Sequence, residues 1–364
     1  DHLRLGEPRL SLCRERSTMR LPRLYLGTMT FAWNQASAPV DDRVALQFLE
    51  RFASAGGRHV DTARIYAAGE TEPMLGRALR SCRSCVSADL LVGSKAAPSQ
   101  PGGLTAAGMR KQLDASLAAI GVESLAEYYL HQPDTEAALL ESLREAHTMV
   151  QEGRVRAVGM SNYHASEVAR AFALCAKHGL TKPSVYQGLY NPLNRAVELE
   201  LLPLLREHGC SFVAFNPLAA GLLSGAHKRG GDVPAGRFKN NPNYLPRFYT
   251  PPNFDALAAI EAACGEAGLS LLQATFCWLL RHSALAETDG LLIGASSLAQ
   301  LEANLEACEM ATAAELPPPV RAAFDAAWEL TRGSAFCYWR SYSADMPGRE
   351  GLDQGASYTA HGPK

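Results

Sequence analysis

From about residue 23 onward, the hydrophobic and polar positions of the chain form alternating short and long segments. The short segments are apolar runs, which is typical of strands buried on both faces. The long segments carry apolar residues at helical spacing and often end at Gly. The predicted strands are residues 23–29, 59–63, 90–94, 125–130, 155–159, 184–189, 211–215 and 290–293. The predicted helices are residues 41–55, 70–80, 105–120, 135–151, 166–178, 196–208, 254–267, 271–281, 298–309 and 318–331.

This alternation predicts an α/β fold with a parallel sheet, because each connection is long enough to cross over. Eight parallel strands close into a (β/α)8 TIM barrel. The alternative is an open doubly wound sheet, which usually carries a G-x-G-x-x-G motif after its first strand. Residues 27–31 occupy that place and do not match the motif. A long loop rich in Gly, Pro and Asn, residues 217–253, follows the seventh strand and is typical of a lid or a disordered segment.

The two ends of the chain fall outside this pattern. Residues 1–20 have five arginines and no clear periodicity, so we expect a disordered N-terminal appendage. Residues 21–340 hold the barrel. The tail, residues 341–364, is rich in Gly and small polar residues, and we expect it to be disordered or to cover the mouth of the barrel.

Composition narrows the classes of function. The formal net charge of −2 gives no electrostatic support for nucleic-acid binding, and no apolar run is long enough to span a membrane. Nine scattered cysteines, an odd number, indicate reduced thiols and a cytoplasmic protein. The motif Cys82-x-x-Cys85 lacks the second pair of ligands that a structural zinc site needs, so it favours a surface loop.

Ionisable residues lie at the ends of three consecutive predicted strands. Asp61 lies near the end of the predicted strand 59–63, and Tyr66 lies in the loop that follows it. Lys95 follows the strand 90–94, and His131 follows the strand 125–130. In a (β/α)8 barrel, catalytic residues gather at the carboxyl ends of the strands. Taken singly, each residue is better explained without a catalytic role: Asp61 as a helix cap or salt-bridge partner, Tyr66 as a loop aromatic, Lys95 as a solvated charge and His131 as a core histidine. Together they favour a catalytic site.

These four side chains suit proton transfer. A tyrosine pKa of about 10 is too high for acid–base catalysis near neutrality, and a nearby ammonium lowers it. A carboxylate beside the ammonium keeps the lysine charged, so Asp61, Lys95 and Tyr66 predict a proton donor tuned towards neutral pH. His131 is placed to orient a carbonyl oxygen or to share its proton. Reduction of a carbonyl also needs a hydride source, which predicts a nicotinamide cofactor.

A metal-dependent barrel hydrolase is another class of enzyme with catalytic residues at strand ends. It needs a cluster of His and carboxylate ligands, and no second His ends a predicted strand. The sequence therefore predicts no metal site.

Several motifs between about residues 24 and 340 resemble the aldo-keto reductase superfamily. They are Gly27-Thr28-Met29, Asp61-Thr62-Ala63-x-x-Tyr66, Ser94-Lys95, Tyr129-Leu130-His131-x-x-Asp134, Gly159-Met160-Ser161-Asn162, Tyr186-Gln187-x-x-Tyr190-Asn191, residues 215–225 and Gly294-x-Ser296-Ser297-x-x-Gln300. Residues 185–191, 214–225 and 338–340 are similar to one branch in particular, the aflatoxin aldehyde reductases, which are also known for reducing succinic semialdehyde.

The resemblance implies a role for each matching residue. Tyr66 would donate the proton with support from Asp61 and Lys95, and His131 would orient the substrate. The residues that would bind NADPH are Met29, Ser161, Asn162, Gln187, Phe215, Asn216, Pro217, Leu218, Gly221, Leu223, Gly225, Arg237, Ser296, Ser297, Gln300 and Asn304. Ser296 and Ser297 open a predicted helix, where amides and hydroxyls suit a phosphate, and this favours NADPH over NADH.

Substrate residues follow from the resemblance to the branch. Tyr244, Arg247 and Arg340 resemble positions that face a substrate carboxylate, an anion that suits a guanidinium. For Arg247, a solvated loop charge is the alternative. The loop around it, residues 240–252, departs from the branch in length and sequence.

The resemblance implies NADPH-dependent reduction of aldehydes, or of ketones, with a small carbonyl compound as the partner. Detoxification of aldehydes and a biosynthetic reduction both fit these residues. The branch also suggests a homodimer. The alternative function is an NADPH-bound regulatory subunit that resembles the potassium-channel β-subunits, which keep the barrel and the four catalytic residues but act mainly by binding.

Overall fold

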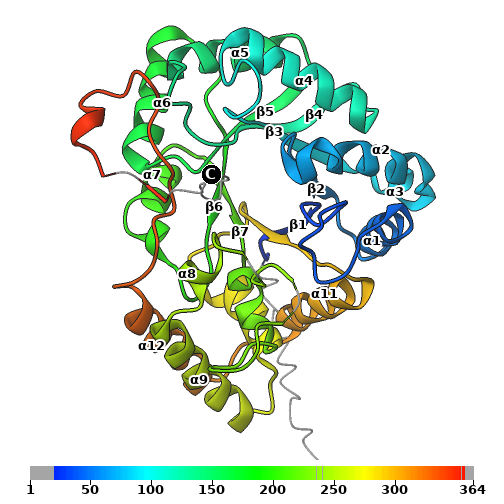
Figure 1. Ribbon diagram of the computed structural model, residues 1–364, viewed down its shortest axis with the longest axis vertical. Helices are drawn as coiled ribbons and strands as arrows, with labels where there is room; N and C mark the ends of the chain where they lie inside the picture. Colours follow the sequence, from blue (N-terminus) through cyan, green and yellow to red (C-terminus); the bar gives the residue numbers. More distant parts are fainter. Residues whose placement is uncertain (1–19, 235, 240, 354, 357–364) are drawn as a thin grey trace, which may run out of the picture.

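The computed structural model describes residues 20–234, 236–239, 241–353 and 355–356. Its strands pair in chain order into a closed parallel barrel (Figure 1). They are β1 (Arg23–Gly27), β2 (His59–Asp61), β3 (Leu91–Ala96), β4 (Leu125–Leu130), β5 (Val155–Ser161), β6 (Val185–Leu189), β7 (Ser211–Phe215) and β8 (Gly290–Ile293). The barrel closes where β8 pairs with β1, with Arg23 opposite Gly290. The predicted (β/α)8 barrel is confirmed, and the open doubly wound sheet is wrong.

Helices surround the barrel on its outer side (Figure 1). They are α1 (Asp42–Ser54), α2 (Thr71–Ser81), α3 (Arg83–Ala88), α4 (Ala106–Ile120), α5 (Leu139–Gln151), α6 (Ala165–His178), α7 (Leu201–Glu207), α8 (Leu245–Phe248), α9 (Pro251–Glu266), α10 (Leu271–Cys277), α11 (Leu298–Ala313) and α12 (Pro318–Thr331). Several of these helices begin or end at capping residues that the sequence shows. Asp41 caps α1 by accepting from the amide of Val44, and Gly121 and Gly179 end α4 and α6 in left-handed conformation.

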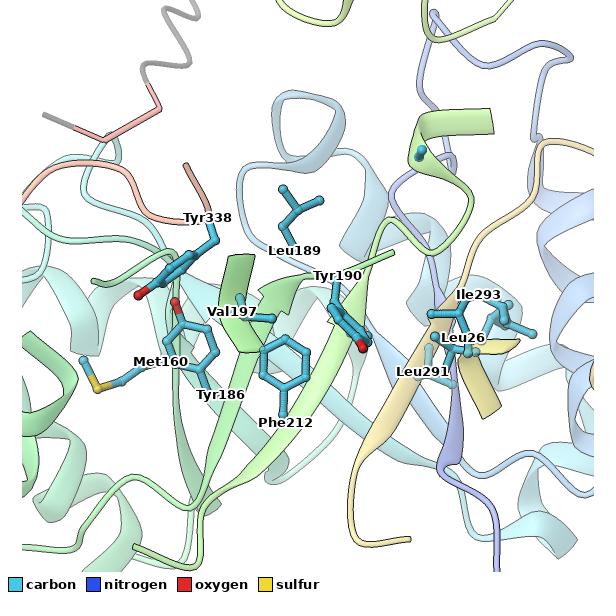
Figure 2. Close-up of a cluster of buried hydrophobic side chains, with 14 of the residues drawn as sticks. Leu26, Met160, Tyr186, Leu189, Tyr190, Val197, Phe212, Leu291, Ile293 and Tyr338 are labelled. Atoms are coloured by element: carbon cyan, nitrogen blue, oxygen red, sulfur yellow. The ribbon is translucent and has the colours of Figure 1, made fainter. Parts of the chain in front are cut away.

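The strands send alternate side chains inward and outward, which creates two cores. The inward set fills the barrel with Tyr25, Tyr129, Val185 and Val213. The outward set packs against the helices and includes Leu26, Met160, Tyr186, Phe212 and Leu291 (Figure 2). This packing fixes the strand ends, where the ionisable residues lie.

The loop after β7 contains more structure than the sequence predicts. It includes the 3-10 helix η3 (Ala219–Ser224) and α8, and α9 already begins at Pro251. The predicted helix at residues 271–281 divides into α10 and a π-helical turn, η4 (Trp278–His282). Among the described residues, no single helix is long and apolar enough to cross a bilayer. The bent pair Pro251–Glu266 and Leu271–His282 passes that test by length and composition alone.

The predicted surface loop at the C-x-x-C motif is wrong. Cys82 is the C-terminal cap of α2, Cys85 lies in α3, and both are buried. They form a disulfide with their Cα atoms 5.3 Å apart, at the point where the end of α2 meets the first turn of α3. The prediction of reduced thiols is therefore wrong for this pair. The free cysteines of the described chain are Cys175, Cys210, Cys264, Cys277, Cys308 and Cys337.

Much of the tail after Arg340 is held against the side of the barrel, beside α6 in Figure 1. The amide of Ser343 donates to the buried carboxylate of Glu167, and Asp345 pairs with Arg170. A disordered tail is therefore wrong for residues 341–353. Residues 1–19, 354 and 357–364 lie outside the described part, so the predictions for them stay untested.

Candidate active site

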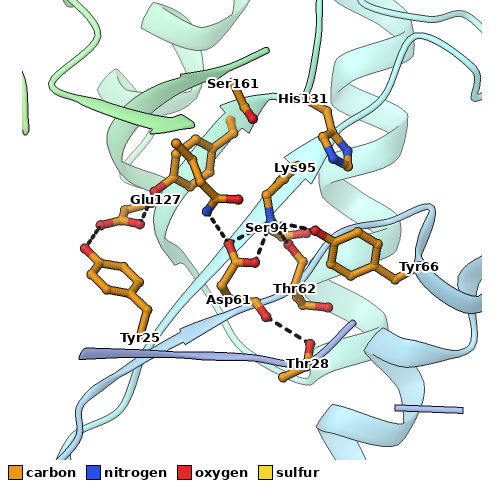
Figure 3. Close-up of polar contacts among 12 residues, drawn as sticks. Tyr25, Thr28, Asp61, Thr62, Tyr66, Ser94, Lys95, Glu127, His131 and Ser161 are labelled. Carbon is orange, nitrogen blue, oxygen red and sulfur yellow. Dashed lines mark hydrogen bonds and ion pairs between the residues drawn. The ribbon is translucent and has the colours of Figure 1, made fainter. Parts of the chain in front are cut away.

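The carboxyl ends of β2, β3 and β4 bring Asp61, Tyr66, Lys95 and His131 together (Figure 3). The Lys95 ammonium lies 2.7 Å from both carboxylate oxygens of Asp61 and 2.8 Å from the backbone oxygen of Thr62. It also lies 3.4 Å from the Tyr66 hydroxyl. The rings of Tyr66 and His131 meet edge to face, with centroids 5.9 Å apart. Lys95 lies within β3, which extends to Ala96 and is longer than predicted.

The Lys95–Asp61 ion pair is buried inside the barrel, where neither side chain is more than 4% exposed. Burial alone would lower the pKa of Lys95, but the Asp61 carboxylate and the Tyr66 hydroxyl outweigh it and raise that pKa. Gln187 on β6 donates a further hydrogen bond of 2.8 Å to Asp61. The lysine therefore stays charged, in agreement with the expectation from the sequence.

The pKa of Tyr66 moves in the opposite direction from the prediction. Burial of the phenol raises this pKa more than the Lys95 ammonium lowers it, and the Asp61 carboxylate raises it further. The prediction of a proton donor tuned to neutral pH is therefore wrong in the direction of the pKa shift. The charge of Lys95 is largely balanced by Asp61, so burial decides the sign. Tyr66 is a neutral phenol, the form that can donate a proton.

His131 is neutral for a related reason. Burial, and then the charges of Lys95 and Arg340, hold the pKa of His131 well below its usual range. Its Nδ1 atom is buried and has no hydrogen-bond partner among the described residues. The ring lines the cavity in front of Tyr66. The imidazole of His131 therefore has a ring nitrogen available for a hydrogen bond to a polar ligand in this cavity.

A cavity of about 570 Å³ extends from these residues along the carboxyl face of the barrel. The predicted site residues that line it are Met29, Asp61, Tyr66, His131, Ser161, Asn162, Gln187, Phe215, Asn216, Pro217, Leu218, Gly221, Arg237, Tyr244, Ser296, Gln300, Asn304 and Arg340. The structure thus joins residues that are more than two hundred positions apart in the sequence.

Five predicted site residues do not line the cavity. Lys95 lies behind Asp61 and Tyr66, and Leu223 is buried in the helical core. Gly225 ends the turn η3, and Ser297 caps α11 by accepting from the amide of Gln300. Arg247 stacks its guanidinium on the ring of Phe336, 5.4 Å from the centroid, and its place at the substrate stays a prediction.

One end of the cavity has a mixed set of donors and acceptors beside an aromatic ring. Ser161, Asn162 and Gln187 provide hydroxyl and amide groups, and Phe215 lies at the end of β7. Asn162 adopts a φ of 62°, which is tolerated by Asn, and its amide donates to the backbone oxygen of His131. This combination matches a flat ring that carries a carboxamide.

The other end of the cavity is suited to an anion. Arg237 lies between the rings of Trp33 and Tyr244, 5.6 Å from each centroid, and also lines the cavity. Helix α11 begins at the cavity wall, where the positive end of the helix dipole favours a negative charge. The residues present therefore fit an anionic dinucleotide.

Comparison with known families agrees with this geometry. The Aldo/keto reductase family model matches residues 23–317, which include the whole barrel. The chain belongs to the aldo/keto reductase family. Membership supports an oxidoreductase that reduces carbonyl groups with a nicotinamide cofactor.

Curated relatives place this aldo/keto reductase in the predicted branch. Human Aldo-keto reductase family 7 member A3 is 38% identical over 336 residues, 88% of this chain and 97% of the relative. Human Aflatoxin B1 aldehyde reductase member 4 is 38% identical over 326 residues, 85% and 94% of the two chains. Mouse Aflatoxin B1 aldehyde reductase member 2 is 37% identical over 331 residues, 88% of each chain. The resemblance to the aflatoxin aldehyde reductases is confirmed.

Sequence reasoning missed several residues that line the cavity of this aldo/keto reductase. Trp33, Gln35 and Ser37 come from the loop after β1, and His227 and Phe238 come from the loop after β7. Both loops leave the carboxyl ends of strands, so the rule that found Asp61 could also have found them. The sequence could not show how these loops fold over the barrel.

Proposed function

We propose that this protein reduces aldehydes to alcohols with NADPH. The observation that carries the proposal is the position of the Tyr66 hydroxyl. It lies at the wall of a cavity that fits a dinucleotide, 3.4 Å from a buried ammonium and beside a neutral histidine. A phenol in this place has the geometry of a proton donor to a carbonyl oxygen.

In this proposal each residue of the group has one task. The bound nicotinamide would supply a hydride to the carbonyl carbon of the substrate. Tyr66 donates its proton to the carbonyl oxygen, and the Lys95 ammonium stabilises the phenolate that remains. Asp61 holds Lys95 through two bonds of 2.7 Å. Neutral His131 orients the carbonyl oxygen by a hydrogen bond.

The cofactor residues divide between the two ends of the cavity. Ser161, Asn162 and Gln187 would hold the carboxamide, and Phe215 would stack on the nicotinamide ring. Residues 216–226 would wrap around the pyrophosphate. Arg237 and the start of α11 support NADPH over NADH, because both suit the extra phosphate.

Arg340 and Tyr244 support a substrate that carries an anionic group. Both line the cavity, and Arg340 also bonds to Gln132 at 2.5 Å and, through its amide, to the backbone of Asn162 at 2.9 Å. These bonds place the guanidinium near the strand ends. We infer that aldehydes with a carboxylate are favoured over neutral aldehydes of similar size.

Oxidation of NADPH and of NADH with an aldehyde panel tests the proposal. The panel contains succinic semialdehyde, 4-nitrobenzaldehyde, methylglyoxal and pyridoxal. We expect turnover with NADPH and the highest kcat/KM for succinic semialdehyde. Tight NADPH binding without turnover of any aldehyde would instead support the regulatory subunit.

A further inference from the structure

The turn that presents Tyr66 has an unfavourable backbone conformation. Tyr66 begins η1 (Tyr66–Gly69), and the two residues after it, Ala67 and Ala68, adopt φ values of 46° and 54°. Residues other than glycine rarely adopt this left-handed region, because the Cβ atom crowds the backbone. Two consecutive alanines therefore keep the left-handed conformation only where contacts with the surrounding structure stabilise it.

An ion pair on the outer side of the barrel lies against this turn. Arg64, two residues before Tyr66, bonds to Glu72 of α2 at 2.6 Å. The Glu72 side chain is completely buried, whereas that of Arg64 is 22% exposed. The guanidinium also covers Gly69, where a Cβ atom would lie 3.0 Å from Arg64 Nη2. The pair thus spans the turn from its start to its end.

The same carboxylate reaches the strand that carries Lys95. The hydroxyl of Ser94 donates to the second oxygen of Glu72 at 2.6 Å. Ser94 and Lys95 are neighbours on β3, so their side chains point to opposite sides of the barrel wall. Glu72 therefore joins the Tyr66 turn to β3 from outside, while Lys95 approaches Tyr66 from inside.

We propose that Arg64, Glu72 and Ser94 form a clamp that sets the position of Tyr66 relative to Lys95. The inference rests on the proposed function of Tyr66 as the proton donor. The three residues do not touch the cavity, so they are positioning residues. Without the clamp, Ala67 and Ala68 relax towards ordinary backbone angles, and the phenol moves away from Lys95.

Two variants weaken the clamp in different ways. Glu72→Gln keeps the shape of the side chain but removes its charge, and Arg64→Met keeps the packing on Gly69. We expect kcat to fall by about 100-fold in each variant, because a displacement of a reacting group by about 1 Å lowers the rate by that factor. The Kd of NADPH, measured by fluorescence titration, should not change. Wild-type kcat in both variants would overturn the proposal.

A rescue experiment separates the clamp from a general loss of structure. Replacing Ala67 and Ala68 with glycine in the Glu72→Gln background makes the left-handed turn accessible again. We expect kcat to recover about tenfold, because glycine adopts that region without a penalty. If kcat does not recover, then Glu72 does not act by maintaining the conformation of the turn, and the proposal is overturned.

A matched control and a second readout keep the test independent of turnover. Asp289 is also a buried carboxylate paired with arginine, Arg206, but it precedes β8 at the opposite end of the barrel. Asp289→Asn should lower stability and leave kcat unchanged. If the wild type reduces no aldehyde, the proposed function fails, and the clamp is then tested by the rate of amide hydrogen exchange in residues 64–72. Faster exchange in Glu72→Gln than in the wild type would support the clamp, and an unchanged rate would overturn it.

Discussion

At the scale of single residues, the site depends on one buried positive charge. Lys95 is enclosed by Asp61, the backbone of Thr62 and the Tyr66 hydroxyl. A charge in this position must be balanced, because an isolated ion in a protein interior is strongly destabilised. Burial of the phenol outweighs the effect of the Lys95 ammonium on the pKa of Tyr66, and the Asp61 carboxylate that keeps Lys95 charged raises that pKa further.

Removing this charge should cost stability. Among the described residues, Lys95→Met leaves the buried Asp61 carboxylate with the Gln187 amide as its one side-chain partner, so we expect the free energy of unfolding to fall by about 3 kcal/mol. Lys228→Met is the control, because Lys228 is 65% exposed and pairs with Glu261 at the surface. Lys228→Met should lower the free energy of unfolding by less than about 1 kcal/mol. Urea unfolding compares the two, and equal losses would contradict this account.

The raised pKa of Tyr66 predicts the direction of the pH dependence. Reduction needs the protonated phenol, so kcat should stay constant through neutral pH. It should fall only as the pH rises through a pKa above the ordinary tyrosine value of about 10. Alcohol oxidation needs the phenolate and should speed up over the same range. Stopped-flow rates in both directions test this sign, and a fall in reduction rate between pH 7 and 9 would contradict it.

At the scale of elements, close packing of helices on the barrel fixes where the strand ends lie. Gly76 of α2 packs directly on the last carbonyls of α4, and a Cβ atom there would clash with the backbone oxygens of Ala119 and Ile120. Because α2 carries Glu72, this contact also positions the proposed clamp. The two helices can approach this closely only because residue 76 is glycine.

Two glycine substitutions separate packing from helix propensity. Gly76→Ala should lower the free energy of unfolding by about 1–3 kcal/mol, because the backbone of α4 cannot move away cheaply. Gly265 of α9 has open space around its Cα, so Gly265→Ala should raise stability by about 0.5–1 kcal/mol. Thermal unfolding measures both, and a change of the same sign would contradict the packing argument.

At the scale of the whole molecule, the barrel also encloses Glu127, an ionisable group on β4 that is separate from the four candidate catalytic residues. Glu127 accepts hydrogen bonds from Tyr25 at 2.8 Å and from Tyr129 at 2.5 Å, which join β1 to β4 across the interior (Figure 3). Burial raises the pKa of Glu127 despite these bonds, and the charge of Asp61 adds to the rise. The network therefore links the strands with a carboxyl group that is costly to ionise.

Glu127 should add its own pH dependence to the free energy of unfolding. Its folded pKa exceeds the unfolded value, so the contribution of Glu127 to stability is fully present below about pH 4.5 and is lost as the pH rises through the folded pKa. Relative to Glu127→Gln, the wild type should therefore lose free energy of unfolding above pH 4.5. Glu123→Gln, an exposed site just before β4, is the control. A difference between wild type and Glu127→Gln that is constant with pH would contradict this prediction.

The sequence predicted the barrel and most of the site because both follow local rules. Apolar runs defined the strands, and strand ends placed Asp61, Lys95 and His131 on one face. What it could not predict depends on distances between segments. The buried Cys82–Cys85 disulfide, the stacking of Arg247 on Phe336 and the raised pKa of Tyr66 are set by packing and burial, which spacing does not encode.

The most direct test of the account is the rate of NADPH oxidation by Tyr66→Phe at saturating aldehyde, measured beside the Kd of NADPH. Phenylalanine keeps the ring against His131 and removes only the hydroxyl that would donate the proton. The account predicts a fall in kcat of about 100-fold or more with an unchanged Kd. A variant that binds NADPH and turns over as fast as the wild type would contradict the central role of Tyr66.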